Sequence, residues 1–492
     1  MMSALLISAA HKSSGKTTLA VGLCAALAAR GLRVQPFKKG PDYIDPMWLA
    51  QAAGRDCFNL DPYLSGREEI AAAFAQHAAG ADISIVEGNK GLYDGLALDG
   101  SNSNAALAKQ LGLPVLLVID VRGMTRGIAP LILGYQAFDR EIRIGGVILN
   151  QLGGARHEAK LRAVIEHYTD VPVLGAVQRD ARLELVERHL GLMPDHEVDD
   201  AVERLQAMGR AIAEQVDLAR VLDVAKTCTA PVAPTGPAPQ RLRAGGQAGD
   251  SLRIGIARDK AFGFYYPDDL AALQTEGATL VTIDTLADAH LPALDGLFIG
   301  GGFPELFMAE LEANLSLRIE LHRAIQDGLP VYAECAGLMY LARTLNWNGR
   351  SAQMVGAIPG DVVMHERPVG RGYVRLEESA DFPWTHAAGP SQPTLRLGHE
   401  FHHSSLENLD PSVRTAYRVQ RGHGIDGARD GVCVHNLLAS YAHLRHTGGN
   451  DWPRRFIAFV RDVRRAATCP APRPRAHAPP RSTGLVNVKE AG

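Results

Sequence analysis

Cysteine is scarce in this chain, and neither sign of charge is in excess. Only six of the 492 residues are cysteine, and no two of them form a C-x-x-C pair. Cysteines this sparse do not build a disulfide scaffold, so a reducing, cytoplasmic location is expected. Lysine and arginine number 51 and aspartate and glutamate 54, which gives a formal net charge of -3. This near balance provides no electrostatic reason to expect nucleic acid or an anionic membrane as a partner.

Long hydrophobic runs are also missing. The most apolar internal run, from Leu113 to Ile119, is far too short to span a bilayer. The opening residues, MMSALLISAAHKSSGK, lack the basic segment and the cleavage site of a signal peptide. We therefore expect a protein with no membrane association. A chain of 492 residues with 46% hydrophobic content predicts two or three globular domains rather than one core.

Two regions with alternating strand and helix patterns are separated by a stretch without a hydrophobic pattern. In the first region, the runs ALLISA, ISIVEG, VLLVID and IGGVILN are typical of buried strands in a parallel sheet covered on both faces. Residues 227–250 are rich in proline, glycine and alanine and predict a linker. We therefore expect an α/β protein with a first domain at 1–226, a second at 251–467 and a disordered, proline-rich tail at 468–492.

A phosphate-binding loop is predicted between the first strand and the first helix. Residues 10–17 read A-H-K-S-S-G-K-T, which matches G-x-x-x-x-G-K-[ST] except for Ala10 at the first glycine. The alternative is an ordinary glycine turn before a helix. In a phosphate loop, backbone N–H groups would cradle the phosphates, the lysine would neutralise their charge and the threonine hydroxyl would bind Mg²⁺. The predicted nucleotide-binding residues of this segment are Ser14, Gly15, Lys16, Thr17 and Thr18.

Acidic residues at strand ends are the candidates to complete a magnesium site with Thr17. Magnesium bound to phosphates takes one or two carboxylates, and a doubly wound sheet binds its ligands at the carboxyl ends of the strands. Glu87 ends the run ISIVEG before the loop EGNKGLYDG, and Asp42 follows the second strand in FKKGPDYIDP. Asp45 and Asp94 are the alternatives. Each of these carboxylates could instead cap a turn or a helix.

A cysteine nucleophile is predicted in the second region. The segment LPVYAECAGLMYL has the pattern of a strand, a sharp turn and a helix, with Cys335 at the turn. A thiol at a helix N-terminus is a better nucleophile than a free one. The N–H of Ala336 and one from the glycine run 300–302 would face a developing oxyanion. The alternative is a small cysteine buried in the core.

The base that would activate this thiol is expected to be a histidine distant in sequence. The chain has 18 histidines, and spacing alone does not separate His443 from His435 or His446. Residues 399–403 fit H-E-x-x-H, but a zinc site of that type requires both histidines on one face of a long helix. The flanks TLRLG and SSLENLDP predict a strand leading into a loop, so zinc is not assigned there.

Together these motifs resemble those of the cobyrinic acid and hydrogenobyrinic acid a,c-diamide synthases, from about Ala4 to His443. The similar segments are SSGKTT, QPFKKGPDYIDP, VEGNKGLYDG, GGGFPE, AECAGLMYL, GHEFHHS and ASYAHL. The resemblance implies an N-terminal dethiobiotin-synthetase-like P-loop domain with a mainly parallel sheet and a C-terminal class I glutaminase-like α/β domain. It implies ATP and Mg²⁺ as cofactors. The site residues that it implies are Cys335 as nucleophile, His443 as its base, and Asp42 and Glu87 at the magnesium and phosphate site.

The activity implied by the resemblance is amidation of the a and c side-chain carboxylates of a corrin precursor in cobalamin biosynthesis. ATP would form an acyl phosphate, and L-glutamine would give ammonia at the cysteine. Ala10 and Ala336 stand where family members commonly carry glycine, which the loops can accept if φ is negative there. Arg445 stands where classical class I glutaminases carry a glutamate. We therefore expect a Cys-His dyad with no carboxylate as a third member.

Other activities share part of this pattern. Cobyric acid synthase and nickel-sirohydrochlorin a,c-diamide synthase would use the same chemistry on related macrocycles. A ParA/MinD-like switch ATPase would share the phosphate loop, but it usually has a lysine where this chain has His11, and it would have no use for Cys335. The sequence leaves open the cobalt content of the ring, the order of the amidations and the oligomeric state, with a homodimer as one option.

Overall fold

The computed structural model describes residues 2–184, 187–188, 191–198, 200–230, 251–384 and 394–468. Most of the predicted linker, at 231–250, and the predicted disordered tail from 469 onward lie outside these residues. Among the described residues, no helix is both long and apolar enough to cross a membrane.

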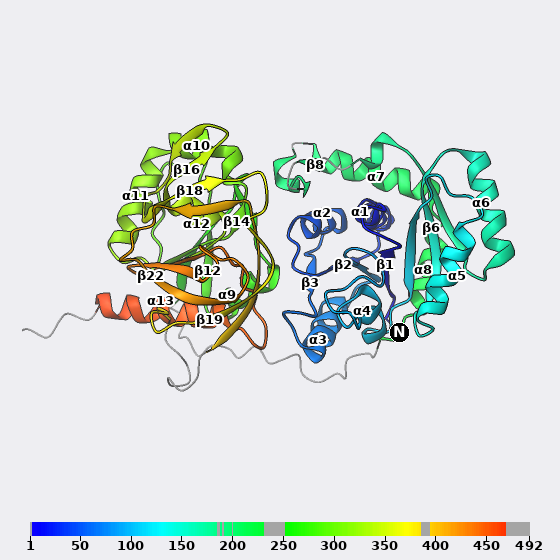
Figure 1. The fold of residues 1–492 in the computed structure, drawn as a ribbon, viewed down its shortest axis with the longest axis horizontal. Helices are drawn as coiled ribbons and strands as arrows, with labels where there is room; N and C mark the ends of the chain where they lie inside the picture. Colours follow the sequence, from blue (N-terminus) through cyan, green and yellow to red (C-terminus); the bar gives the residue numbers. More distant parts are fainter. Residues whose placement is uncertain are drawn as a thin grey trace, which may run out of the picture.

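The first part of the chain forms a seven-stranded sheet, blue to cyan in Figure 1. Its strand order is β3-β2-β4-β1-β5-β6-β7, and every neighbouring pair is parallel. This confirms the mainly parallel sheet predicted from the apolar runs. The strands are β1 (Ala4–Ala9), β2 (Val34–Lys39), β3 (Phe58–Leu60), β4 (Ile83–Glu87), β5 (Val115–Asp120), β6 (Ile144–Leu152) and β7 (Val173–Gln178).

Helices cover both faces of this sheet, so its central strands contact no water. Every residue of β1, β2, β4 and β5 is buried. This explains why β1, β4 and β5 are near-continuous apolar runs in the sequence, whereas β2 ends in two buried lysines. One face packs against α1 (Lys16–Ala28), α2 (Ile44–Ala53), α7 (Ala201–Gln215) and α8 (Leu218–Lys226). The other packs against α3 (Arg67–Ala78), α4 (Asn104–Gln110), α5 (Ile128–Phe138) and α6 (Ala155–Tyr168).

The second part of the chain forms a nine-stranded sheet in the order β12-β10-β13-β15-β24-β23-β22-β19-β20. The pairs from β12 to β24 are parallel, and those from β24 to β20 are antiparallel. The strands are β10 (Leu252–Ala257), β12 (Ala278–Ile283), β13 (Gly296–Ile299), β15 (Val331–Glu334), β19 (Gly370–Glu378), β20 (Leu395–His402), β22 (Arg414–Arg421), β23 (Arg429–Val434) and β24 (Leu437–Ser440).

Helices again lie on both faces of this sheet, which confirms the second α/β unit. α10 (Met308–Ala313), α11 (Leu315–Gln326) and α12 (Ala336–Leu341) share one hydrophobic cluster, and α9 (Pro267–Thr275) and α13 (Trp452–Thr468) share another. A four-stranded sheet and a two-stranded ribbon flank it. They comprise β16 (Ala342–Trp347), β17 (Arg350–Gln353), β18 (Ile358–Met364) and β21 (Ser404–Glu407), and β11 (Phe262–Phe264) with β14 (Gly301–Gly302).

The two parts meet through the region around α2 and β3, as Figure 1 shows. The Tyr373 hydroxyl donates to Asp61, 3.0 Å from either carboxylate oxygen. Gly448 N–H donates to the Glu69 carboxylate at 2.8 Å, and the Arg445 guanidinium donates to a backbone carbonyl at the end of β3. The carboxyl ends of β2 and β3, where an open parallel sheet binds ligands, therefore face the second sheet.

Substitution of Gly337 tests how closely α12 packs against the second sheet, next to the turn that contains Cys335. A β-carbon at this position would lie 2.4 Å from the Ile299 carbonyl oxygen of β13. We expect Gly337→Ala to push α12 away from the sheet, to lower the free energy of unfolding by roughly 1–3 kcal/mol and to disturb the adjacent turn. Urea unfolding monitored by circular dichroism measures the loss.

Gly134→Ala is the matched control, because Gly134 also lies within a helix, α5, and a β-carbon there meets no atom within 4 Å. This variant should be neutral or more stable by up to about 1 kcal/mol. Equal effects of the two substitutions would contradict the packing constraint on α12.

Candidate active site

The loop between β1 and α1 has the backbone of a phosphate-binding turn. Ser13 has φ 63° and Gly15 has φ 86°. A β-carbon on Gly15 would lie 2.2 Å from the Asn150 side-chain nitrogen, which donates to the Ser14 carbonyl at 2.9 Å. Glycine is thus required here by both conformation and space. Ala10 does not have a positive φ, so the departure from the first glycine of the motif causes no backbone strain.

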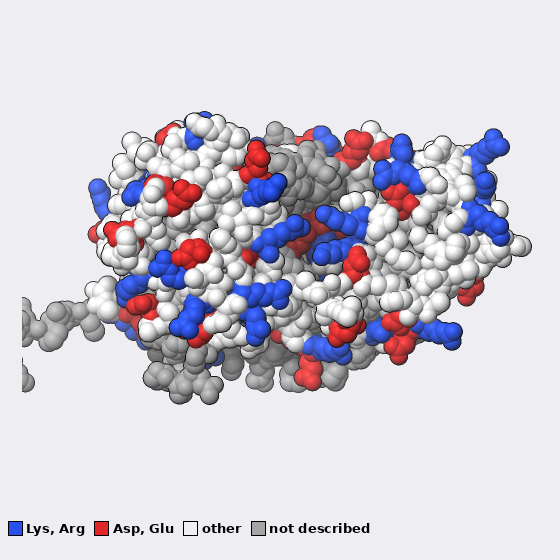
Figure 2. Space-filling view, in the orientation of Figure 1, with Lys and Arg blue, Asp and Glu red and all other residues white. Residues whose placement is uncertain are grey.

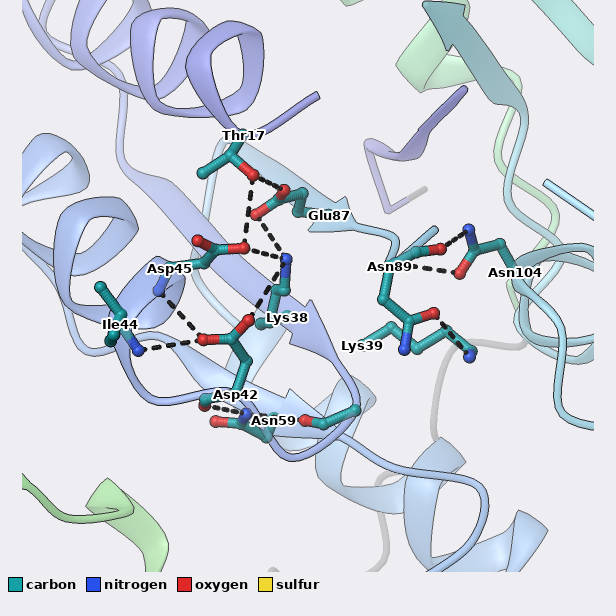
Figure 3. A network of polar contacts seen from close by, with 11 residues as sticks. Thr17, Lys38, Lys39, Asp42, Ile44, Asp45, Asn59, Glu87, Asn89 and Asn104 are labelled. Atoms are coloured by element: carbon teal, nitrogen blue, oxygen red, sulfur yellow. Dashed lines mark hydrogen bonds and ion pairs between the residues drawn. The ribbon is translucent and has the colours of Figure 1, made fainter. Parts of the chain in front are cut away.

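Behind this loop, a lysine lies among three carboxylates (Figure 3). Lys38 Nζ is 3.1 Å from Glu87 and 3.9 Å from Asp42, and its nearest contact is with Asp45. Thr17 Oγ1 donates to Glu87 Oε1 at 2.6 Å and lies 3.3 Å from Asp45 Oδ2. Burial by itself would lower the pKa of Lys38, but these carboxylates raise it well above its usual range. The lysine is therefore charged and holds the acidic residues together.

The structure brings together Thr17, Glu87 and Asp42, the three residues predicted to bind magnesium, and adds Asp45 to them. Thr17 and Glu87 are hydrogen-bonded. Asp42 accepts two backbone N–H groups at the start of α2 and faces Lys38 with its other oxygen. Asp45, the alternative, is the carboxylate closer to Thr17. Burial, together with the charge of Asp45, raises the pKa of Asp42 to about 7.

The chemistry of these side chains fits a magnesium ion that binds with nucleotide. All the candidate ligands are hard oxygen atoms, which Mg²⁺ prefers, and one or two carboxylates suffice when phosphates supply the other ligands. Among the described residues, no group of three or more histidine, cysteine, aspartate or glutamate side chains is arranged to hold a metal ion alone. The charge of Lys16 interacts with those of Glu87, Lys38 and Asp45, and burial lowers the pKa of Lys16 below its usual value.

An asparagine that the sequence motifs did not single out shapes the loop after β4 (Figure 3). Asn104 is fully buried and donates to Ser8 Oγ at 3.0 Å and to the carbonyls of Asn89 and Gly91 at 2.6 and 3.0 Å. Lys39 in turn donates to Asn89 Oδ1 at 3.1 Å, and burial lowers the pKa of Lys39 to about 8. Asn104 begins α4 with no phosphate motif around it, so no local pattern marks it.

Cys335 lies at a sharp turn between β15 and α12, which confirms the predicted strand, turn and helix. Its backbone has φ 49° and ψ −100°, a strained conformation for a residue other than glycine. Its N–H is held by the Ser440 carbonyl at 2.7 Å, on the neighbouring strand β24. Ala336 does not have a positive φ, so the second departure from glycine is also free of strain. The turn presents the thiol at the carboxyl end of the second sheet.

His443 is the histidine that the structure places with the thiol, and a glutamate lies on the other side of its ring. The imidazole hydrogen-bonds Cys335, and its Nδ1 is 3.3 Å from Glu334 Oε2. The other oxygen of Glu334 accepts the Tyr332 hydroxyl at 2.6 Å and the Leu444 N–H at 2.8 Å. Two further donors thus fix the orientation of the Glu334 carboxylate. The side chains of Cys335, His443 and Glu334 are all buried.

The expectation that no carboxylate contacts the histidine is therefore wrong. Arg445 is turned away from the site and donates to Asp268 at 2.6 Å. Burial lowers the pKa of His443, but hydrogen bonds to Cys335 and Glu334 outweigh it and raise that pKa to about 10. A carboxylate one residue before the nucleophile, rather than two after the histidine, provides the stabilising charge.

The other candidate histidines have different surroundings. His435 hydrogen-bonds a glutamine of α11 at 3.0 Å, and His446 lies 3.5 Å from an aspartate. His399 lies in β20, which confirms the strand predicted for that segment, and its ring stacks on that of His443 with the centroids 4.9 Å apart. Burial and the neighbouring His443 hold the pKa of His399 well below its usual value. His399 is thus a neutral neighbour of the charged imidazole.

One cavity of about 490 Å³ joins the acidic cluster to the thiol. Figure 2 shows lysine and arginine side chains around the hollow between the two parts of the molecule. Arg371 and the half-exposed ring of Phe401 line the cavity, with the guanidinium carbon 5.8 Å from the ring centroid. The lining residues that bear on chemistry are Lys39, Asp42, Asp45, Gly302, Cys335 and His443. Two candidate sites far apart in sequence therefore open into one cavity.

Comparison with known proteins identifies a domain family for each of the two parts of the chain. Residues 6–192 match a model of the CobQ/CobB/MinD/ParA nucleotide binding domain, and residues 253–451 match a model of the CobB/CobQ-like glutamine amidotransferase domain. The chain is 46% identical over 458 residues to a cobyrinate a,c-diamide synthase of Magnetococcus marinus, covering 93% of this chain and 97% of that protein.

Further relatives carry the same name. The cobyrinate a,c-diamide synthase of Methanosarcina acetivorans is 42% identical over 464 residues, covering 89% of this chain and 92% of that protein. That of Listeria monocytogenes is 39% identical over 445 residues, covering 90% of this chain and 96% of that protein. The similarity therefore extends over both parts of the chain.

Glu334→Gln tests the charge pairing at the thiol. Cys335 and Glu334 both raise the pKa of His443, and the variant removes the second of these, so we expect that pKa to fall from about 10 by roughly 1–3 units. Histidine-ring NMR titrations of the wild type and the variant measure it, with His443→Gln used to identify the signal. An unchanged midpoint would show that Glu334 does not support the charge on His443.

Proposed function

The chain belongs to the cobyrinate a,c-diamide synthase family, and on this premise we propose that it amidates the a and c side-chain carboxylates of cobyrinic or hydrogenobyrinic acid. ATP would activate each carboxylate, and glutamine would supply the nitrogen. The observation that carries the proposal is the single cavity lined both by the acids near the phosphate loop and by the thiol with its histidine. A switch ATPase would need neither the thiol nor the amidotransferase part of the chain.

In the first step, a substrate carboxylate oxygen attacks the γ-phosphorus of ATP, ADP leaves and an acyl phosphate forms. This replaces oxide, a very poor leaving group, by phosphate. Lys16 and the N–H groups of its loop would hold the phosphates. Thr17, Glu87 and Asp45 or Asp42 would hold Mg²⁺, which when bound would offset the charge on the transferred phosphoryl group.

Glutamine is hydrolysed at the other end of the cavity. The Cys335 thiolate attacks the carboxamide carbon, and the oxyanion that forms would accept the Ala336 N–H and one from Gly301 or Gly302. His443 then gives its proton to the departing nitrogen, so ammonia leaves and a thioester remains. Water hydrolyses the thioester to glutamate and restores the thiol. Glu334, 3.3 Å from His443, would stabilise the imidazolium in the steps in which the ring carries the proton.

The shared cavity supplies the route between the two steps. Ammonia released at Cys335 would attack the acyl carbon near the acids, and phosphate would leave as the amide forms. Lys39 and Arg371 line this space and would attract a macrocycle that carries many carboxylates, while the exposed face of Phe401 would contact its apolar ring. The cavity walls come from both parts of the chain, so each ligand would be enclosed only when the two are in contact.

We also propose that the two activities divide between domains at 1–226 and 251–467. The matched domain models lie within these limits. A reducing, cytoplasmic location is supported by the five cysteines of the described residues, all of which are free thiols.

The substrate is tested by mass spectrometry of products. Cobyrinic acid, hydrogenobyrinic acid and nickel-sirohydrochlorin are each offered with ATP, Mg²⁺ and glutamine. We expect one of the first two to gain two amide groups. Gain of amides only by nickel-sirohydrochlorin, or at other carboxylates of the corrin ring, would replace the proposed substrate by that of a related synthase.

Cys335→Ala tests the division of labour. The variant should lose glutamine-dependent amidation but keep amidation supported by high ammonium, because the thiol acts only on glutamine. Rates with each nitrogen source are measured by the same product assay. A folded variant that is inactive with ammonium as well would contradict the separation of the two sites.

Lys16→Ala tests the role of the phosphate loop, as Cys335→Ala tests that of the thiol. Because carboxylate activation comes before amide formation, it should lose roughly 10²-fold or more in rate with either nitrogen source. Near-normal turnover of Lys16→Ala with ammonium would exclude the phosphate loop from the reaction.

A further inference from the structure

A tyrosine of the nucleotide-binding part reaches into the glutaminase site. Tyr43 stands between the two acids of the loop that follows β2, and only 8% of its surface is exposed. Its hydroxyl lies 3.3 Å from Nδ1 of His443. Its ring centroid is 4.4 Å from that of Tyr266 and 5.3 Å from that of Phe264, both of the second part of the chain. The Tyr43 side chain thus packs against the second part of the chain, whereas its backbone belongs to the first part.

The backbone at this point is tightly tied to the acidic cluster. Asp42 accepts the N–H groups of Ile44 and Asp45 at 3.0 and 3.2 Å, so its carboxylate closes the loop around Tyr43 (Figure 3). Asn59 donates to the carbonyl of Asp42 at 2.7 Å. A change at either acid, such as the arrival of phosphate and metal, therefore acts directly on the segment that carries the tyrosine.

On the glutaminase side, the hydroxyl meets a nitrogen that already has a partner. Nδ1 of His443 is 3.3 Å from Glu334 Oε2 and also 3.3 Å from the Tyr43 oxygen. If Nδ1 carries a hydrogen, the Tyr43 and Glu334 oxygens share it. If it does not, the tyrosine donates to Nδ1 and Oε2 of Glu334 loses the imidazole as a donor. In both cases the tyrosine competes with the carboxylate for one nitrogen. Cys335 and the stacked His399 also contact the ring.

We propose that Tyr43 is a positioning residue for His443 that makes glutamine hydrolysis depend on the occupancy of the acidic cluster. With the acids free, the hydroxyl weakens the hydrogen bond between His443 and Glu334. When magnesium nucleotide binds at Asp42 and Asp45, the loop shifts, the hydroxyl withdraws and Nδ1 bonds Glu334 alone. Hydrolysis of glutamine then accelerates when its ammonia can be used. The inference rests on the proposed function, because it assumes a glutaminase at Cys335 and a nucleotide site at the loop.

The position of Tyr43 between two cavities supports this role. It lines the 490 Å³ cavity that contains the thiol and also a second cavity of about 460 Å³ behind α2. The residue therefore borders both cavities, although only 8% of its surface is exposed and neighbouring aromatic rings contact its ring. A side chain that only filled the core would be enclosed all around and would not direct its polar atom at a titrating histidine.

The test compares Tyr43→Phe with the wild type in glutamine hydrolysis, without macrocycle. Glutamate release is measured with and without Mg²⁺ and AMP-PNP, a nucleotide that is not hydrolysed. Equilibrium dialysis first establishes the concentration of AMP-PNP that saturates the enzyme. We expect the nucleotide to raise the wild-type kcat by about fivefold or more. Tyr43→Phe keeps the stacked ring and loses only the competing hydroxyl. Its kcat without nucleotide should rise toward the stimulated value, and its response should be lost.

Tyr373→Phe is the matched control, because it also removes one hydroxyl bond between the two parts of the chain, that to Asp61. It should keep the nucleotide response. A second readout is the pH dependence of Cys335 alkylation by iodoacetamide, which the nucleotide should shift in the wild type but not in Tyr43→Phe. A tyrosine that was merely structural would lower the stability of the variant and its kcat, with no gain in the nucleotide-free rate.

The outcomes separate the inference from the proposed function. A wild type that hydrolyses no glutamine, or binds no magnesium nucleotide, would overturn both. A wild type that does both without stimulation would overturn the inference alone. So would a Tyr43→Phe enzyme that responds as the wild type does, or whose nucleotide-free rate falls.

Discussion

The need to pair buried charge determines how this structure is organised around its sites. Lys38 is almost fully buried and is surrounded by three carboxylates. His443 is buried to a similar degree and lies between a thiol and the Glu334 carboxylate. A buried charge without a partner would cost several kcal/mol, so each of these residues dictates where its neighbours lie. The acids near the phosphate loop and the carboxylate beside the cysteine are held in place by this requirement.

The two charged clusters lie in different sheets but open into one cavity. Each lies at the carboxyl ends of parallel strands, where loops can vary without disturbing the strands. The first sheet contributes rigid backbone for phosphates, and the second contributes a strained turn for a thiol. Because the carboxyl ends of β2 and β3 face the second part of the chain, only the shared cavity separates the two clusters. Tyr43 connects the two clusters, because its backbone lies between Asp42 and Asp45 and its hydroxyl lies 3.3 Å from Nδ1 of His443.

Much of the fold and the core of each site could be read from contiguous residues. The apolar runs predicted the parallel strands, and G-K-T after a strand predicted the phosphate turn that Gly15 makes. The strand, turn and helix around Cys335 were equally local. These predictions succeed because backbone conformation over a few residues is governed by neighbours along the chain. The resemblance to the diamide synthases, which the similar proteins confirm, selected His443 from 18 histidines where spacing had left three open.

Side-chain partners between distant segments were decided by the tertiary structure. Arg445 occupies the position at which classical glutaminases carry their third member, which predicted a dyad, yet the Glu334 carboxylate contacts a histidine 109 residues away. Lys38 and Tyr43 lie within the segment QPFKKGPDYIDP and Asn104 lies outside the recognised motifs, but no local pattern gives any of them a partner. Asp45, the alternative to Asp42, is the carboxylate within 3.3 Å of Thr17. The sequence alone determined the backbone of each motif, since that depends on short-range sterics and burial. Only the packed sheets decided which charged atoms meet, because that depends on the direction of side chains brought together from hundreds of residues apart.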